Sequence, residues 1–475
     1  MTNVSLNSQN FRARNVPEAG TDNMADASVV EDKDLVESSV EWKIDTDALT
    51  GLRGLVALHI ALGHILNNSR VGIDLQGGMS MSFFYLLSGF IMSIAYGSKA
   101  TKGETTGTIE IDVAASKENS FTIEKWKFWK NRFARLYPMY LLTNLTAIPM
   151  ALEFNRFSIS NVLVTMSGMN MWVYPFAPTF FLMPLNGGTW TIQTMLFFYL
   201  VFPALFPFLL GITDRFKMIR SMYWTQLFFF FAPFLIYIPI YGELKGAEYS
   251  YWVARAWPVS RLPVFIMGCL AAIERVKRKG DQWSKKIKPA ALSACCCCGS
   301  KQINDSDPSE EKYWKRRRIC DTSACSYMIL LIAVIFSVFL IKIRAIGEMK
   351  QLPLKIKAIG EAITPLLFLR LLLSLTETSD ERKQGIMTTS NDKQDKKRSV
   401  FESICRSKAA IFLGNISLGF YLIHMQVVML TKGLFNYNEY WPPIWIIPIN
   451  IFVSIILGYV VTYMVEKPMQ RFLRR

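Results

Sequence analysis

The sequence predicts an all-α fold, an integral membrane bundle of about ten transmembrane helices. Three observations lead to this fold class. Of the 475 residues, 51% are hydrophobic and 19% are charged, whereas charged residues make up about a quarter of an average soluble domain. Apolar segments recur along the chain, close to the roughly 20 residues that a membrane-spanning helix needs. Lysines and arginines gather in the connections between these segments, as in the cytosolic loops of membrane proteins.

Ten segments are apolar enough to be spans. In chain order, the predicted spans are 49–66, 79–96, 137–152, 191–212, 222–241, 262–273, 327–343, 359–375, 410–430 and 444–465. Residues 1–44 are polar and predict a disordered cytosolic N-terminal tail. Residues 45–475 then form the transmembrane domain, with cytosolic loop insertions at about 274–326 and 377–408.

The positive charge, a net +16, indicates how the chain is oriented in the membrane. With ten spans and a cytosolic N-terminus, the basic connections 97–131, 213–220, 274–326 and 377–408 all fall on one side, together with the tail QRFLRR. We therefore predict that both termini are cytosolic. Both the plasma membrane and an endomembrane fit this pattern. Because the cations lie in loops between apolar runs, the charge does not indicate nucleic-acid binding.

The chain has eight cysteines, of which Cys295 to Cys298 are consecutive. They lie among lysines in a predicted cytosolic loop, so the run is either a palmitoylation site or a tolerated run in a flexible loop. No second cysteine pair or histidine stands at zinc-ribbon spacing from it. The sequence therefore predicts no metal site.

The first predicted span carries two ionisable residues on one face. Arg53 and His64 are eleven residues apart, which separates them by about 20° around a helix and about 16 Å along it. His59 lies on roughly the opposite face. Taken alone, Arg53 could be a snorkelling anchor and His64 an interfacial histidine. An ionisable pair on one face of a spanning helix favours a functional site.

Further motifs follow the first-span sequence LTGLRGLVALHIALGH. In order, they are FFYLLSGF at 83–90, Arg132 and Arg135 ahead of Pro138, a segment with Trp190, Tyr199 and Pro203, a segment with Arg261, Phe265 and Gly268, ISLGFYLIH ending on His424, and VEKPMQRF. This ordered set resembles membrane acyltransferase family 3, whose members are O-acyltransferases that modify glycans and other hydroxyl-bearing acceptors. The resemblance covers roughly 45–275 and 405–475.

The resemblance implies transfer of an acyl group, acetyl first among the candidates, from acyl-CoA to a hydroxyl of a glycan, lipid or small molecule. The chain departs from many bacterial members at three positions where they carry acidic residues: Ser82, Met195 and Leu196. Any role of those acids in binding the acceptor is therefore missing from this chain, which favours an acceptor other than a bacterial sugar.

Each motif residue has a predicted role. Histidine is the natural base for activating a hydroxyl, so His64 is the predicted general base, with Arg53 as its catalytic partner. Guanidinium groups bind phosphate, so the predicted contacts to the phosphates of acyl-CoA are Arg53, Arg132, Arg135 and Arg261. The predicted substrate-binding residues are Ser88, Trp190 and Tyr199. The alternatives are helix-end anchors for the arginines, close helix packing at Ser88 and a membrane-interface position for Trp190.

Two other functions compete with acyl transfer. In a transporter, Arg53 and His64 would line a pathway. Proton-coupled carriers usually rely on buried carboxylates, and few acids lie within the predicted spans, Glu361 being the clearest. In a non-catalytic membrane scaffold, the motif residues would serve packing alone. The predicted partners are membrane lipids, acyl-CoA and a hydroxyl-bearing acceptor.

Overall fold

The structure is a computed structural model of the chain. It describes residues 46–68, 75, 77–101, 123–153, 157–177, 184–280, 352–376, 400–435 and 443–474. The tail 1–44, the predicted span 327–343 and the cysteine run 295–298 lie outside the described residues, as does most of both loop insertions. The described residues all belong to one compact unit, Ser39–Arg475.

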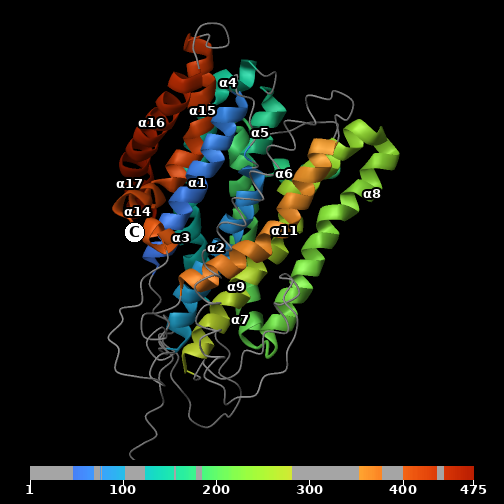
Figure 1. Cartoon of the computed structure of the whole chain (residues 1–475), viewed down its shortest axis with the longest axis vertical. Helices are drawn as coiled ribbons and strands as arrows, with labels where there is room; N and C mark the ends of the chain where they lie inside the picture. Colours follow the sequence, from blue (N-terminus) through green and yellow to red (C-terminus); the bar gives the residue numbers. More distant parts are fainter. Residues whose placement is uncertain are drawn as a thin grey trace, which may run out of the picture. The chain divides into compact units, whose positions relative to one another are not determined.

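The described part of the chain folds into helices and contains no strand, as the predicted fold class requires. The α-helices are α1 Asp47–Asn68, α2 Gly77–Thr101, α3 Lys125–Leu145, α4 Ile148–Glu153, α5 Ile159–Ser167, α6 Asn170–Val173, α7 Trp190–Leu210, α8 Arg215–Ala256, α9 Pro258–Gly280, α11 Leu352–Leu375, α13 Val400–Cys405, α14 Lys408–Asn415, α15 Ser417–Phe435, α16 Pro443–Val461 and α17 Lys467–Arg474. A 3-10 turn, Gly187–Thr189, leads into α7, and a π-helix, Thr462–Glu466, joins α16 to α17. Figure 1 shows these helices along the bundle.

Six helical segments of the described part are long and apolar enough to cross a membrane, or seven if the bent pair α14 and α15 counts as one span. The chain is thus a multi-pass membrane protein, but the predicted count of about ten spans is not confirmed. Two predicted spans, 222–241 and 262–273, fall within the segment Arg215–Val276, which comprises α8 and most of α9 and contains a helix break at Gly242. The predicted span 137–152 falls at α3 and α4, and α3 begins with the charged run KWKFWKNR, which lowers its hydropathy.

Helix α8 reverses direction at Gly242. Its φ of 77° and ψ of 167° break the helix, and this left-handed region is accessible mainly to glycine. The two arms of α8 lie against each other beside this break. The contact at Gly246 is so close that an added side chain would overlap the backbone of Ile238 and Tyr237. Figure 1 shows this bend at the upper end of α8, from which the chain returns toward α9.

Glycines bring α2 and α9 into backbone contact. A methyl group added at Gly89 would overlap the carbonyl of Phe265, and one added at Gly268 would overlap the carbonyl of Leu86. Small residues allow such close approach between membrane helices. The glycines of two separate sequence motifs therefore form one reciprocal helix contact, which explains why both motifs contain them.

The glycines of the first-span motif pack α1 against α14. A methyl group at Gly54 would lie 2.5 Å from the backbone nitrogen of Gly414, and one at Gly414 would overlap the carbonyl of Thr50. Helix α14 is therefore held close to the N-terminal part of α1. This contact presents the side chain of Arg53, which lies between the motif glycines, to the end of α14.

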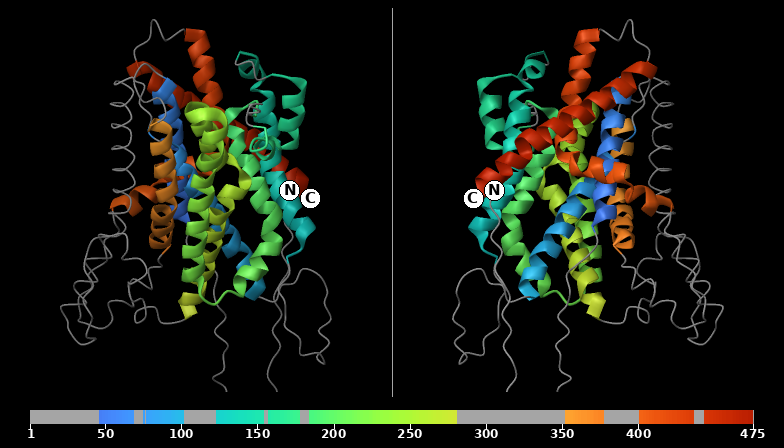
Figure 2. Two further views of the ribbon diagram at one scale, coloured as in Figure 1. Left: turned by 90° about the vertical axis from the view of Figure 1, so that its right-hand side faces the viewer. Right: turned by 90° about the vertical axis from the view of Figure 1, so that its left-hand side faces the viewer.

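The C-terminal helices cross the rest of the bundle. In the right-hand view of Figure 2, α16, the π-helix and α17 form one long rod that runs diagonally and ends beside α3, and α17 contacts α3. A π-helix changes the register of the residues that follow it and is frequent at functional sites. The rod thereby places the charged residues Glu466 and Arg474 near the arginines of α3.

Candidate active site

Arg53 of α1 is bound to the end of α14. Its Nε and Nη2 atoms donate to the carbonyl oxygen of Gly414 over 3.0 and 2.5 Å. Carbonyl groups in the last turn of a helix have no partner within that helix, and the chain bends by 75° between α14 and α15. Arg53 therefore caps α14 at the bend, a role that the motif spacing alone did not reveal.

Electrostatic interactions link Arg53 to Arg135, and Arg135 in turn to a further arginine, Arg474. Arg53 interacts electrostatically with Arg135 of α3 and with Glu466 of the π-helix. Arg474 of α17 interacts in the same way with Arg135 and Arg132. We call Arg53, Arg132, Arg135 and Arg474 the basic cluster. The structure thus brings together three of the four predicted donor-binding arginines, with the carboxylate of Glu466 beside them.

Aromatic rings border the basic cluster. The guanidinium carbon of Arg132 lies 5.4 Å from the ring centroid of Phe128 and 5.6 Å from that of Tyr199, within the range of a cation–π contact. The hydroxyl of Tyr199 lies 3.1 Å from the Oγ atom of Ser88. These contacts link α2, α3 and α7. They connect Arg132 to Ser88 and Tyr199, both predicted to bind substrate.

His64 meets a second histidine. Its ring centroid lies 5.3 Å from that of His424, with an angle of 30° between the ring planes. His64 is half-buried, whereas His424 of α15 is 1% exposed. His59 of α1 instead has its Nδ1 atom 2.8 Å from the Oγ atom of Ser80. The two histidines of α1 therefore have separate environments, and the one in the Arg53 register is paired with another imidazole.

The hydrogen bonding of His424 defines its tautomer. Its Nδ1 atom lies 2.6 Å from the carbonyl oxygen of Tyr421. A carbonyl can only accept, so Nδ1 carries the hydrogen and donates. In the neutral ring, Nε2 is then an acceptor, and this atom is buried without a hydrogen-bond partner among the described residues. Buried polar atoms without a partner are uncommon and call for an explanation.

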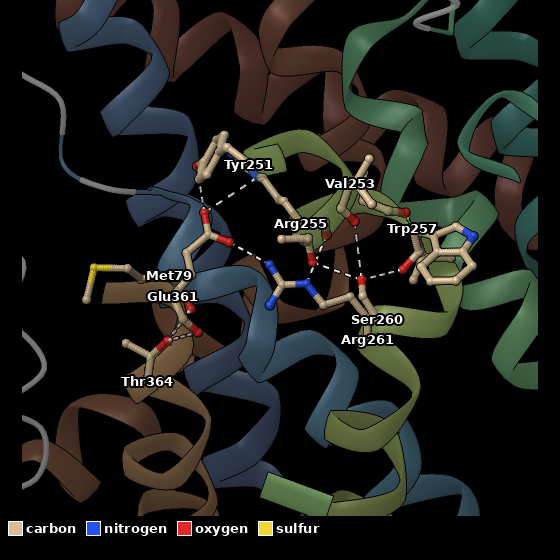
Figure 3. A network of polar contacts seen from close by, with 12 residues as sticks. Met79, Tyr251, Val253, Arg255, Trp257, Ser260, Arg261, Glu361 and Thr364 are labelled. Carbon is tan, nitrogen blue, oxygen red and sulfur yellow. Dashed lines mark hydrogen bonds and ion pairs between the residues drawn. The ribbon is translucent and has the colours of Figure 1, made fainter. Parts of the chain in front are cut away.

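A charged network lies near the first turn of α2 and joins α8, α9 and α11 (Figure 3). Arg261 donates from Nη2 to Oε2 of Glu361 over 2.5 Å, and these side chains are 0% and 1% exposed. The Oε1 atom of Glu361 accepts from the hydroxyl of Tyr251 over 2.8 Å and lies 3.6 Å from Nε of Arg255. We call Arg255, Arg261, Glu361 and Tyr251 the charge network.

Trp190 faces this network. The guanidinium carbon of Arg255 lies 5.3 Å from the Trp190 ring centroid. Trp190 is 4% exposed, unlike the tryptophans that sit at a membrane interface. Arg261 makes its side-chain hydrogen bonds to Glu361 and to the carbonyl of Arg255. Among the described residues, these bonds place Arg261 in the charge network, apart from the basic cluster that holds the other predicted donor-binding arginines.

Sequence reasoning missed several residues of these groups. Arg474 reaches the arginines of α3 only through the diagonal path of the C-terminal rod (Figure 2). Arg255 and Tyr251 lie on the returning arm of α8, between the predicted spans 222–241 and 262–273. Within the described ranges, no group of three or more His, Cys, Asp or Glu side chains could hold a metal ion.

Two curated proteins are similar to parts of the chain. The acyltransferase MdmB of Streptomyces mycarofaciens is 24% identical over 285 residues, which are 54% of this chain and 64% of that protein. Protein 2 in the picA locus of Rhizobium radiobacter is 35% identical over 95 residues, which are 20% of this chain and 39% of that protein. The chain thus spans less than two thirds of the length of each relative. No solved structure matches it significantly.

A family model described as an acyltransferase domain matches residues 46–366. The match covers more than half of the chain and includes α1, α2, α3, α7, α8, α9 and most of α11. It therefore contains His64, most of the basic cluster and the whole charge network. By this match, the chain belongs to membrane acyltransferase family 3.

Proposed function

We propose that this protein is an integral membrane O-acyltransferase that moves an acyl group, acetyl first, from acyl-CoA to a hydroxyl of a glycan, lipid or small molecule. The observation that carries the proposal is the arrangement along α1. Arg53 belongs to the basic cluster, and His64 stands on the same helix face beside His424. One helix thus connects a phosphate-binding group to a base, at a rise of about 16 Å.

The basic cluster is the proposed site for the phosphates of acyl-CoA. Guanidinium groups bind phosphate through paired N–H donors and stay charged at any working pH. Arg132 rests against the rings of Phe128 and Tyr199, and Nε of Arg132 has no hydrogen-bond partner among the described residues. Arg261 is left out of this donor site because its side chain is fully buried against Glu361.

The acyl arm of the donor would extend from the basic cluster toward His64. Ser88 and Tyr199 are the proposed substrate contacts at the cluster, because their hydroxyl groups meet beside Arg132. Trp190 is the proposed contact at the charge network, since its ring packs on Arg255. On this assignment, Ser88 and Tyr199 contact the substrate at the basic cluster, and Trp190 contacts it at the charge network.

His64 is the proposed general base. It takes the proton of the acceptor hydroxyl while the hydroxyl oxygen forms a bond to the thioester carbonyl carbon. The carbon–sulfur bond then breaks, and the coenzyme A thiolate takes the proton from the imidazolium of His64. The products are the acyl ester and free coenzyme A, and His64 returns to its neutral form. No metal ion enters this sequence of steps.

The test is thioester turnover by the purified full chain in nanodiscs. Acetyl-CoA is supplied with a panel of hydroxyl-bearing acceptors, and free thiol release is followed for the wild type, His64→Ala and His59→Asn. We expect a decrease in kcat of about 10²–10⁴-fold for His64→Ala and near wild-type turnover for His59→Asn, since His59 lies on roughly the opposite face of α1 and its Nδ1 atom lies 2.8 Å from the Oγ atom of Ser80. Full turnover by His64→Ala would remove the proposed base. An absence of acetyl-CoA binding would favour a transporter or a scaffold.

A further inference from the structure

We propose that His424 is a positioning residue for His64: it fixes the tautomer and orientation of the base by accepting its N–H at Nε2. This inference rests on the proposed acyl transfer. It starts from the Nε2 atom of His424, which is buried inside the bundle and has no hydrogen-bond partner among the described residues. Because His424 is 1% exposed, that atom has little access to solvent. A lone pair buried in this way needs a donor nearby.

The backbone determines which atom of His424 is available. The hydrogen bond from Nδ1 to the carbonyl of Tyr421 holds the hydrogen on that side of the ring. Nε2 is therefore the acceptor. The same arrangement occurs at functional histidines, where a hydrogen bond at one ring nitrogen determines the chemistry of the other.

The geometry places His64 within reach of that acceptor. In an in-line N–H···N bond, two imidazole centroids lie about 5 Å apart, given a donor–acceptor distance near 3 Å. The observed centroid distance is 5.3 Å. The two rings are therefore close enough for an N–H of the half-buried His64 to reach Nε2 of His424 when the His64 ring is turned toward it. The other nitrogen of His64 would carry the lone pair that the acceptor hydroxyl needs.

The surroundings of His424 support this pairing. The rings of Tyr421 and Phe420 lie 5.6 and 6.4 Å from it by centroid. Phe420 and Tyr421 have no ring nitrogen. Among these three ring neighbours, His64 is therefore the one whose ring can donate an N–H to Nε2 of His424. An environment of aromatic rings would suit an apolar side chain equally well, so simple packing does not explain a histidine at this position.

Two substitutions distinguish positioning from packing. In His424→Gln, the amide N–H can donate to the Tyr421 carbonyl and the amide oxygen can accept from His64. In His424→Phe, an aromatic ring is kept but both functions are lost. A positioning role predicts that the Gln variant retains more activity than the Phe variant. A packing role predicts the reverse order, because burying an amide among rings is unfavourable.

The experiment measures kcat and the KM for acetyl-CoA of both variants in nanodiscs, alongside the wild type and His64→Ala. A matched control is Thr431→Val, which removes another buried hydrogen bond of α15, to Asn450. We expect kcat to fall about tenfold in His424→Gln and about a hundredfold in His424→Phe, with KM within about twofold of the wild type. The control should keep its kcat.

The outcomes are separable. If His424→Phe equals or exceeds His424→Gln in kcat, the positioning role is overturned while acyl transfer by His64 stands. If the Phe variant is not recovered folded, His424→Leu, which also loses both functions, takes its place, and a kcat of the Leu variant equal to or above that of His424→Gln overturns the proposal. If the wild type shows no turnover that depends on His64, the proposed function falls and this inference falls with it.

Discussion

Arg261 and Glu361 form an ion pair with a nitrogen–oxygen distance of 2.5 Å, and both side chains are sealed from solvent. A hundred residues separate them in the sequence, on α9 and α11. Moving two charges into a low-dielectric interior is costly, and leaving one of them without its partner costs more. The pair is therefore a strong determinant of how the two helices meet.

Removing the Glu361 carboxylate should destabilise the bundle. Glu361→Ala leaves Arg261 buried without its counter-ion, so the free energy of unfolding should fall by about 3–5 kcal/mol. The measurement is thermal or denaturant unfolding of the protein in detergent. The matched control is Glu124→Ala, which breaks a pair with Lys127 in which both side chains are about half exposed; such pairs contribute about 0–1 kcal/mol. Equal effects of both substitutions would contradict the assignment.

The glycine contact between α2 and α9 should not tolerate a methyl group. Gly89→Ala and Gly268→Ala each force a methyl group into the backbone of the facing helix, and overpacking of this kind costs about 1–3 kcal/mol. Thermal stability in detergent is the measurement. Gly433→Ala is the control, because the helical position Gly433 has no atom within 4 Å of the added methyl. Alanine there should be neutral or stabilising by up to about 1 kcal/mol.

Arg132 should affect donor affinity more than turnover. If its guanidinium binds a phosphate of acyl-CoA, Arg132→Ala removes a charge-assisted hydrogen bond, and the KM for acetyl-CoA should increase about tenfold or more at similar kcat. Steady-state kinetics over a range of acetyl-CoA concentrations provide the test. Arg220→Ala removes the same charge from an exposed position of α8 and should leave KM unchanged. The same KM in both variants would place the donor elsewhere.

Cys405 should be chemically inert in the folded protein. Burial, together with the nearby Glu402 carboxylate, raises the pKa of its thiol to about 12. Because the thiolate is the reactive form, iodoacetamide at pH 8 should modify Cys405 at least about 1,000-fold more slowly in the folded than in the unfolded chain. Mass spectrometry of the Cys405 peptide, with and without denaturant, measures the ratio. Comparable rates in the two states would show that this thiol is accessible.

The sequence predicted the helical elements well where hydropathy was decisive. The spans predicted at 49–66, 79–96 and 359–375 lie within helices that are apolar enough to cross a membrane, and the span predicted at 191–212 overlaps such a helix, Gly187–Leu210. The prediction was weaker where charge or a bend interrupts the pattern. The segment at 137–152 falls on a helix with a basic start, and that at 410–430 falls on a pair bent by 75°.

The sequence predicted part of the spatial arrangement of the candidate site residues, whose roles remain predictions. Periodicity within one helix correctly places Arg53 and His64 on a common face, because a helix repeats every 3.6 residues regardless of its neighbours. Ser88, Tyr199 and Arg132 were each predicted from motifs, and the structure brings them together. The motif resemblance could not reveal that Arg261 is paired with Glu361 instead of lying with the other arginines.

By itself, the sequence determined the fold class, the family and the face of α1 that carries the proposed chemistry, because composition, ordered motifs and helical periodicity are local properties. Only the tertiary structure decided which distant groups meet: Arg53 with Gly414, His64 with His424, and Arg261 with Glu361. The physical reason is that such contacts depend on how helices cross. In this protein, the way the helices cross depends on backbone contacts at glycines and on buried charge pairs. The residue pattern along a single helix does not predict which other helix it will contact.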